Sequence, residues 1–363
     1  VAEQWGRIGD LARKQGVLGI MLDGIERLEV SGERLAGLTR GLSQQMRLEW
    51  IGEVLQIEQR NRQQMAVMEE MAGMWKQNGC RVMVMKGHAN GTMYPKPEHR
   101  NPGDIDCFLL DERRSTKDEG QETAYKIGNE VARAAGAMVD ESWYKHSVIS
   151  YKGETFENHQ FFVHTRDGKR GKRLEKELEE ELVAGHTDFT DNTDFLPLTA
   201  NTVMPPVQWT AMFLTYHACA HFVSEGLRLK QILDWVMFLK KYQGDVDWTA
   251  FYAFCDRNHL RVFVDAMNTI ARRYFNVNVN DNENENENGK DNLDGESPYA
   301  EKILHNALYE DDYVFNSGKS GWTNRFHLVR NMFRYRWKYE EVYQTSVWKQ
   351  LWWYVSGYLF KTE

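Results

Sequence analysis

Apolar residues recur at intervals of three and four along the first part of the chain. This spacing matches the 3.6 residues per turn of an α-helix, and no proline interrupts the chain before Pro95. We therefore predict an N-terminal helical region over residues 1–78. The positions that carry the spacing are Leu35, Leu38, Leu42, Met46, Trp50, Val54 and Ile57.

After residue 78 the pattern changes into short apolar runs that alternate with polar stretches. Such runs are typical of strands, and the Lys152-Gly153 pair between two of them is typical of a hairpin turn. The expected elements are strands at 81–85, 104–110, 146–151 and 154–164 and a helix at 123–135. Residues 79–195 are therefore predicted to form an α+β core.

Helical spacing returns from residue 196 onward, after a loop that contains Pro197, Pro205 and Pro206. We predict a C-terminal helical domain over residues 196–363. Within it, residues 276–297 are rich in alternating Asn and Glu and cannot bury apolar surface, so we expect a flexible acidic loop there. Metal binding by this acidic tract is the alternative.

The composition narrows the classes of protein to consider. The chain has 363 residues, with 45 Lys and Arg against 53 Asp and Glu, so its net charge is −8 and phosphate binding would need a local site. The four cysteines form no Cys-x-x-Cys pair, which argues against a zinc ribbon or a disulfide framework and favours a cytoplasmic protein. The longest apolar stretches, at 212–223 and 351–360, are shorter than the ~18 residues of a membrane span.

The clearest chemical signal is Gly103-Asp104-Ile105-Asp106, at the start of an expected strand. Side chains two residues apart on a strand point to the same face, about 7 Å apart, so both carboxylates can reach one cation or a pair of cations. Mg²⁺, or Mn²⁺ in its place, is the expected counter-charge because it takes oxygen ligands and keeps positions open for phosphates. The alternative for Asp104 and Asp106 is a solvated strand end.

Basic residues and a glycine precede the two aspartates. Lys86-Gly87 follows an expected strand, and a glycine at such a turn lets backbone N–H groups approach a phosphate. Arg100 lies four residues before Asp104, and its guanidinium suits phosphate oxygens. We therefore predict that Lys86, Gly87 and Arg100 bind substrate. The alternative for Lys86 and Arg100 is an ordinary salt bridge to the aspartates.

Together these segments resemble the signature of the bacterial uncharacterised nucleotidyltransferases, a branch of the DNA polymerase β-like nucleotidyltransferase superfamily. The matching residues are Met85-Lys86-Gly87, Tyr94-Pro95, Arg100, Gly103-Asp104-Ile105-Asp106, Phe156-Glu157-Asn158-His159, His217-Ala-Cys-Ala-His221, Leu227-Arg228 and Leu233-Asp234. One departure is that most members of the superfamily carry a Gly-Ser turn before the aspartates, where this chain has Lys86-Gly87. In our interpretation Lys86 replaces the serine hydroxyl as a phosphate ligand.

The resemblance implies a mixed β-sheet flanked by helices, an NTP substrate such as ATP, two metal-binding aspartates and a third acid on a neighbouring strand. Asp104 and Asp106 match the metal-binding pair, and Glu157 is the natural third acid. By the period of two, Glu157 and His159 share one face of their strand, so we expect His159 to contact substrate. Glu154 is the alternative third acid.

We therefore expect a metal-dependent nucleotidyltransferase that moves an NMP from an NTP to an acceptor hydroxyl and releases pyrophosphate. Asp104, Asp106 and Glu157 are the expected catalytic residues and ligands of Mg²⁺ or Mn²⁺. The acceptor is open between a small molecule, a tRNA and a protein. The alternative is a catalytically silent nucleotide-binding or protein-interaction module on the same fold.

Three further patterns leave two interpretations each. His217 and His221, at i and i+4, could hold zinc or pack within the helical domain. The basic residues at 166–173 could bind an RNA acceptor or form a solvated segment beside the acidic helix that follows. The aromatic residues at 348–360 could lie on a membrane surface or pack against protein.

Overall fold

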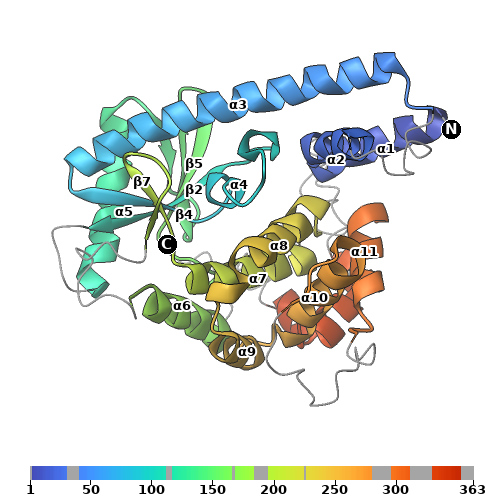
Figure 1. Cartoon of the computed structure of the whole chain (residues 1–363). Coiled ribbons are helices and arrows are strands. Elements are labelled where there is room, and N and C mark those ends of the chain that lie inside the picture. Colours follow the sequence, from blue (N-terminus) through green and yellow to red (C-terminus); the bar gives the residue numbers. More distant parts are fainter. Residues whose placement is uncertain are drawn as a thin grey trace. The chain divides into compact units, whose positions relative to one another are not determined.

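The computed structural model describes residues 2–30, 41–111, 117–165, 168–183, 195–224, 226–279, 296–310 and 329–352. The chain forms two compact units, Val1–Thr210 and Ala211–Glu363 (Figure 1). The finer division that we expected at residues 78 and 195 stays a prediction. Among the described residues, no helix combines the length and the apolar character that crossing a membrane requires.

The first unit contains a mixed, seven-stranded sheet with the order β3-β4-β5-β2-β1-β7-β6. β2 pairs in parallel with β5, and β1 pairs in parallel with β7, whereas the other neighbours are antiparallel. This sheet and its helices confirm the predicted α+β class. The strands are β1 (Cys80–Val84), β2 (Ile105–Asp111), β3 (Met138–Asp140), β4 (His146–Tyr151), β5 (Glu154–His159), β6 (Leu196–Pro197) and β7 (Thr202–Met204).

Helices precede and flank the sheet. The longest, α3, begins where the Ser43 hydroxyl accepts a hydrogen bond from the backbone N–H of Met46 (3.2 Å), which is a typical N-cap. The helical elements of this unit are α1 (Ala2–Gln15), α2 (Leu18–Val30), α3 (Gln44–Gln77), α4 (His88–Gly91), the 3₁₀ turn η2 (Pro97–His99), α5 (Lys117–Ala134) and α6 (Gly168–Val183).

One face of the sheet packs against α3 and α5 (Figure 1). Cys107 and Leu109 of β2 and Phe156 of β5 point to this face and are fully or almost fully buried. Trp75 of α3 meets the Phe156 ring edge to face, with ring centres 5.8 Å apart, and its indole N–H donates to the Gly128 carbonyl of α5 (2.9 Å). Side chains on the opposite face, at the alternate positions, are therefore free to serve a site.

Gly128 allows α5 to approach the sheet closely, which gives a stability prediction. A Cβ at this position would collide with the buried Leu109 side chain and lie 3.1 Å from Nδ2 of Asn158. We expect Gly128→Ala to lower the free energy of unfolding by about 1–3 kcal/mol, because a packed core resists added volume. Gly52→Ala in α3, where nothing lies within 4 Å, is the control and should stabilise by about 0.5–1 kcal/mol. Equal stabilities in chemical denaturation would contradict this prediction.

The second unit is helical, as expected for the C-terminal part of the chain. Its core contains Trp235, which stacks on Phe238 and Phe251 and donates its indole N–H to Oδ1 of Asn268 (2.9 Å). The helices are α7 (Val207–Ser224), which begins in the first unit, α8 (Leu229–Tyr242), the 3₁₀ turn η3 (Gln243–Asp245), α9 (Trp248–Arg257), α10 (Arg261–Phe275), α11 (Ala300–Tyr309) and the π-helical turn η5 (Lys338–Val342).

Candidate functional site

The parallel pairing of β2 with β5 brings two of the predicted acids side by side. Asp106 is directly opposite Glu157 in the strand register, so both side chains lie on the sheet face away from α3 and α5. Asp104 precedes Asp106 by two residues and repels both other carboxylates. Asp106 is 1% exposed, whereas Asp104 is exposed and Glu157 is partly exposed. The structure thus places the three predicted acids in one group.

Lys86 lies within this acidic group. Its Nζ atom is 2.8 Å from Oδ2 of Asp106 in an ion pair, although Oδ2 makes no well-aligned hydrogen bond with a described residue. Burial alone would lower the pKa of Lys86, but attraction to Asp106, Glu157 and Asp104 outweighs burial and holds that pKa above its ordinary value. In the same way burial would raise the pKa of Asp106, but Lys86 and His159 hold it well below its usual range.

The turn after β1 explains how Lys86 reaches the aspartates. The backbone N–H of Met85 donates to the Asp106 carbonyl (3.0 Å), so Met85, directly after β1, is still hydrogen-bonded to β2. Gly87 then adopts φ 69° and ψ −106°, a conformation that residues with a Cβ rarely take. A Cβ at Gly87 would lie 3.6 Å from the Asp104 carbonyl oxygen. Lys86 and Gly87 therefore lie beside the carboxylates, as the sequence suggested.

His159 bridges two of the carboxylates. Its Nε2 atom is 3.2 Å from Oδ1 of Asp106 and 3.3 Å from Oε2 of Glu157. Its Nδ1 atom lies 3.2 Å from the Phe161 carbonyl, which can only accept a hydrogen bond, so Nδ1 carries a proton. The imidazole is 1% exposed, and its second nitrogen faces acids rather than open solvent.

His146 of β4, which the sequence analysis passed over, extends the cluster. It is opposite His159 in the strand register, and the two ring centres are 4.9 Å apart. Its Nε2 atom lies 3.6 Å from Oε1 of Glu157. Burial lowers the pKa of His146 to about 4, so the ring is neutral at pH 7. The hairpin pattern predicted the β4–β5 pairing, but only the register shows that the two histidines meet.

Lys145 is a second residue that the sequence analysis missed. It directly precedes β4 and is close enough to Lys86, Asp106 and Glu157 to sense their charges. Burial, together with repulsion from Lys86, lowers the pKa of Lys145 below the usual lysine value. The site therefore holds two lysines beside three acids.

A buried acid on α6 supports the segment that follows β5. The two carboxylate oxygens of Glu175 accept hydrogen bonds from the backbone N–H groups of Phe162 and Val163, at 2.9 Å each. Burial raises the pKa of Glu175 to about 8. Because His159 donates to the neighbouring Phe161 carbonyl, this anchored segment also orients the imidazole.

Glu154, the alternative third acid, points away from the group. It lies on the other face of β5, is 5% exposed and accepts a hydrogen bond from Nε2 of Gln64 on α3 (3.0 Å). The same Gln64 amide donates to the Gly103 carbonyl (2.9 Å), and its Oε1 atom contacts Nε2 of His88 (2.7 Å). Gln64 thus links α3 to the segments on both sides of the Asp104–Asp106 strand.

Arg100 is buried near His88. It is 6% exposed, and its carbonyl accepts a hydrogen bond from Nδ2 of Asn61 on α3 (3.1 Å). Burial first, and then the Arg100 charge, lower the pKa of His88 to about 4. The predicted contact of Arg100 with substrate stays a prediction.

The remaining sequence patterns lie elsewhere. His217 and His221 pack against each other, with ring centres 4.4 Å apart, and His217 stacks on Phe213. In the basic segment, residues 166 and 167 are outside the described residues, and Arg173 pairs with Glu177 on α6 (4.0 Å). Residues 280–295 of the acidic loop and residues 353–363 of the aromatic segment are also outside the described residues.

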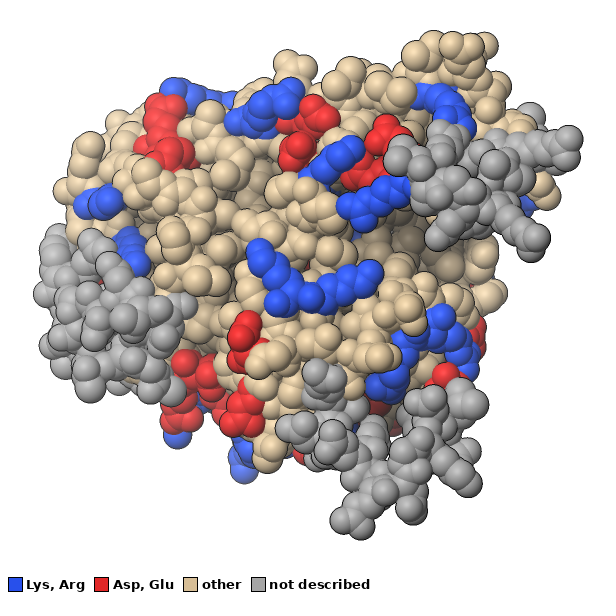
Figure 2. Space-filling view, in the orientation of Figure 1, with Lys and Arg blue, Asp and Glu red and all other residues tan. Residues whose placement is uncertain are grey.

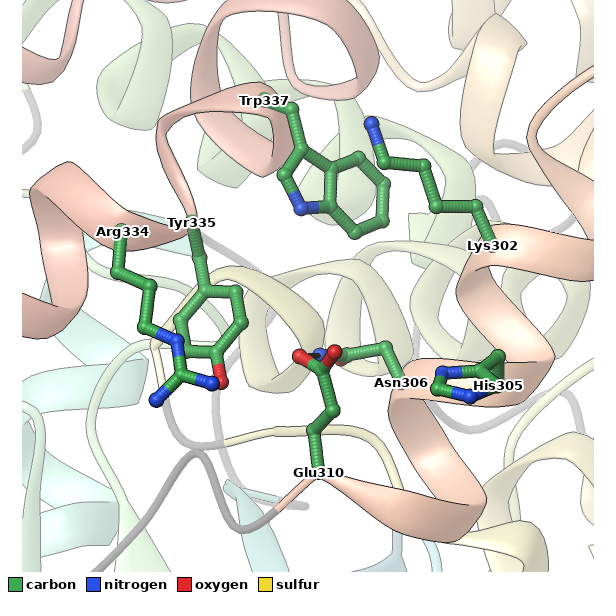
Figure 3. A pocket seen from close by; sticks show the side chains of 7 residues that line it. All are labelled: Lys302, His305, Asn306, Glu310, Arg334, Tyr335 and Trp337. Atoms are coloured by element: carbon green, nitrogen blue, oxygen red, sulfur yellow. Dashed lines mark hydrogen bonds between the residues drawn. The ribbon is translucent and has the colours of Figure 1, made fainter.

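A separate pocket lies in the second unit, between α11 and residues 334–337 (Figure 3). Its volume is about 270 Å³. Lys302 lies over the Trp337 ring (4.0 Å), and Nδ2 of Asn306 donates to Oε2 of Glu310 (2.8 Å). The polar groups of this pocket largely contact one another, and the pocket shares no residue with the carboxylate group.

The donor types of the carboxylate group suit a divalent cation, although among the described residues the side chains whose ligand atoms lie within 4.8 Å of one another are His146, Glu157 and His159, and not the three acids. Asp104, Asp106 and Glu157 supply the oxygen ligands that Mg²⁺ prefers, and Oδ2 of Asp106 keeps a lone pair that no hydrogen bond uses. On the face drawn in Figure 2, Lys and Arg side chains are interspersed with Asp and Glu, in keeping with the net charge of −8. Attraction for a polyphosphate would therefore be local to the cation and to the lysines beside it.

Comparisons with known proteins agree with this architecture. Neither the search of curated proteins nor that of solved structures finds a match. A model of one protein family, described as "Uncharacterised nucleotidyltransferase", matches residues 2–276, which include the whole sheet and Asp104, Asp106 and Glu157. The match spans most of the chain and confirms the family that the sequence motifs indicated. The chain is a member of the uncharacterised nucleotidyltransferase family.

Proposed function

We propose that this protein transfers an NMP from an NTP to an acceptor hydroxyl and releases pyrophosphate. The observation that carries the proposal is the convergence of Asp104, Asp106 and Glu157 on one sheet face, with Lys86 paired to Asp106. Family membership supports nucleotidyl transfer in general. The arrangement of these side chains supports this face of the sheet as the place where the transfer would occur.

The three acids would hold Mg²⁺, or Mn²⁺, through their carboxylate oxygens. When bound, such an ion neutralises phosphate charge and stabilises the oxygens that develop charge during the transfer. Asp106 is the best-positioned ligand because the parallel pairing with β5 and the contact with His159 fix its side chain. Asp104, exposed at the start of β2, would reach the ion from the solvent side.

In the reaction that we propose, an acceptor hydroxyl oxygen attacks the α-phosphorus and forms a new P–O bond. The bond from the α-phosphorus to the bridging oxygen breaks, and pyrophosphate leaves with its electron pair. Glu157, which is partly exposed, would either complete the metal site or accept the hydroxyl proton. Catalysis of this kind depends mainly on positioning and on charge neutralisation, so a few groups suffice.

The lysines would bind the phosphates. Lys86 is 25% exposed and pairs with Asp106, so an incoming triphosphate could form an ion pair with its ammonium group alongside or in place of Asp106. Lys145 lies within the same field and adds a second ammonium. Gly87 keeps the backbone open beside Asp104, where a phosphate could approach. The roles of Arg100 and His159 toward substrate remain predictions.

A catalytically silent binding module is the second candidate. The observation that favours it is that Lys86 and His159 already contact both oxygens of Asp106. A site stabilised by such internal pairs could bind nucleotide, or a protein partner, without turning a substrate over. The same assay separates the two candidates.

The test incubates the purified full chain with each of the four labelled NTPs, with Mg²⁺ or Mn²⁺, and with a cell extract. We expect label to move from one or more NTPs to a small molecule, a tRNA or a protein, with stoichiometric release of pyrophosphate. A chelator in place of the metal ion should abolish the transfer, because the three acids need a counter-charge to hold a polyphosphate. Failure with all four nucleotides and both metals would reject the transferase and leave the binding module.

A further inference from the structure

We propose that His146, Glu157 and His159 form a site for a transition-metal ion such as Zn²⁺, distinct in chemistry from the all-oxygen Mg²⁺ site proposed above. One potential ligand atom from each residue lies within 4.8 Å of the others. Metal binding at these residues does not depend on the proposed function, but its effect on nucleotide transfer does. The ion would share the ligand Glu157 with the Mg²⁺ site. Its ligand His159 lies next to Asp106.

The distances from Glu157 to the two rings are close to those between neighbouring ligands of one metal ion. The two oxygens of Glu157 face different rings: Oε1 lies 3.6 Å from Nε2 of His146, and Oε2 lies 3.3 Å from Nε2 of His159. Ligands of a tetrahedral ion with bonds of about 2.0–2.1 Å are separated by about 3.3–3.4 Å. Because the two distances run to different oxygens, Glu157 would bind such an ion through both oxygens or turn one of them toward both rings, while the strands stay in place.

His159 is prepared to act as a ligand. Its Nδ1–H donates to the Phe161 carbonyl, and an imidazole whose other nitrogen donates to a carbonyl is the usual arrangement for a metal-bound histidine. Its Nε2 atom then faces Oδ1 of Asp106 (3.2 Å) and Glu157. If Nε2 carries a lone pair, that lone pair points at two carboxylates. The resulting repulsion is removed when a proton or a metal cation lies between Nε2 and the carboxylate oxygens.

His146 supplies a second nitrogen from the neighbouring strand. The β4–β5 register places it opposite His159, and β-sheet hydrogen bonds hold both backbones. Its Nδ1 atom is buried and makes no hydrogen bond with any described residue, so no partner fixes the ring in a protonated form. The ring is therefore available to bind an ion through the nitrogen that faces Glu157.

The donor set determines which ion fits. Imidazole nitrogens favour Zn²⁺, Co²⁺ and related ions, whereas Mg²⁺ prefers oxygen and water. Two nitrogens and a carboxylate leave a fourth position for water. Asp104 lies outside the three-residue cluster, so its loss should leave this second ion in place.

The test titrates metal-free full-length protein with Co²⁺ as a spectroscopic probe, and with Zn²⁺ and Mg²⁺ by calorimetry, all without nucleotide. We expect one equivalent of Co²⁺ or Zn²⁺ to bind at least ~100-fold more tightly than Mg²⁺, and X-ray absorption of the Co²⁺ protein to show histidine nitrogen among the ligands. Absence of nitrogen ligands in the wild-type protein would overturn the proposal.

Variants locate the site. His146→Gln should lower the Zn²⁺ affinity at least ~10-fold, as should Glu157→Gln, with circular dichroism used to confirm folding. His164→Gln is the matched control, because that ring contacts Tyr144 (3.2 Å) and is outside the cluster. Unchanged affinity in both His146→Gln and Glu157→Gln would refute the site.

The outcomes for the two proposals are separable. Metal binding through nitrogen, with no transfer from any NTP, would uphold the site and reject the transferase. Transfer supported by Mg²⁺, with Zn²⁺ bound no more tightly than Mg²⁺, would do the reverse. Asp104→Asn should keep the affinity for Zn²⁺ while it loses transfer, because only the oxygen site needs that carboxylate.

Discussion

Replacement of Asp104 by asparagine is expected to lower the rate of nucleotide transfer at least ~100-fold and to leave the melting temperature nearly unchanged. The change removes one carboxylate from the group that would hold the catalytic cation, and losses of this size are usual when charge stabilisation at a transition state is removed. Asp104 is exposed, and Glu157 and Asp106 repel its charge. Its loss should therefore cost little folding energy and relieve some repulsion.

Turnover is measured with the labelled nucleotide and acceptor found in the first assay, and stability is measured by thermal circular dichroism. Asp140→Asn provides the matched control, because Asp140 is an exposed aspartate on β3 of the same sheet, whose side chain accepts hydrogen bonds from Ser142, including one from its backbone N–H (2.8 Å). Wild-type turnover in Asp104→Asn would remove this residue from the catalytic group. Reduced turnover in both variants would point to a general effect of lost surface charge.

The aspartate pair could be predicted from local periodicity, because Asp104 and Asp106 are two residues apart at the start of one strand. The third acid came from the resemblance to the family, which implies an acid on a neighbouring strand, and the period of two then placed Glu157 and His159 on one face. The Lys86-Gly87 pair directly after the apolar run 81–85 placed the turn correctly. The parallel register of β2 with β5, which opposes Asp106 to Glu157, is a long-range pairing that no local spacing specifies.

Lys145 and His146 illustrate what the sequence could not provide. His146 begins β4, which pairs with β5, and Lys145 directly precedes that strand, so their approach to Asp106 and Glu157 follows from sheet order and not from any motif. Arg100 is a case that the backbone geometry leaves open. Its carbonyl accepts a hydrogen bond from Asn61 on α3, and its charge acts on His88, so its role toward substrate stays a prediction.

The contact between Lys86 and Asp106 predicts the largest loss of stability. Lys86→Met leaves a carboxylate that is 2% exposed with His159 as its remaining close partner. Removal of one member of a buried ion pair typically costs about 3–5 kcal/mol, and we expect about 2–3 kcal/mol here because the Lys86 side chain is 25% exposed. The free energy of unfolding of metal-free protein is measured by urea denaturation.

A double-mutant cycle shows whether this loss comes from the pair itself. If Lys86 and Asp106 stabilise each other, Lys86→Met with Asp106→Asn should cost less than the sum of the single changes, by about 1–3 kcal/mol. Lys152→Met is the control, because Lys152 pairs with Glu70 at 2.6 Å but both side chains are about half exposed, and such surface pairs contribute at most about 1 kcal/mol. Additive effects at Lys86 and Asp106 would mean that Lys86 is held by the other acids. An incoming nucleotide would then not have to displace Lys86 from Asp106 in order to bind it.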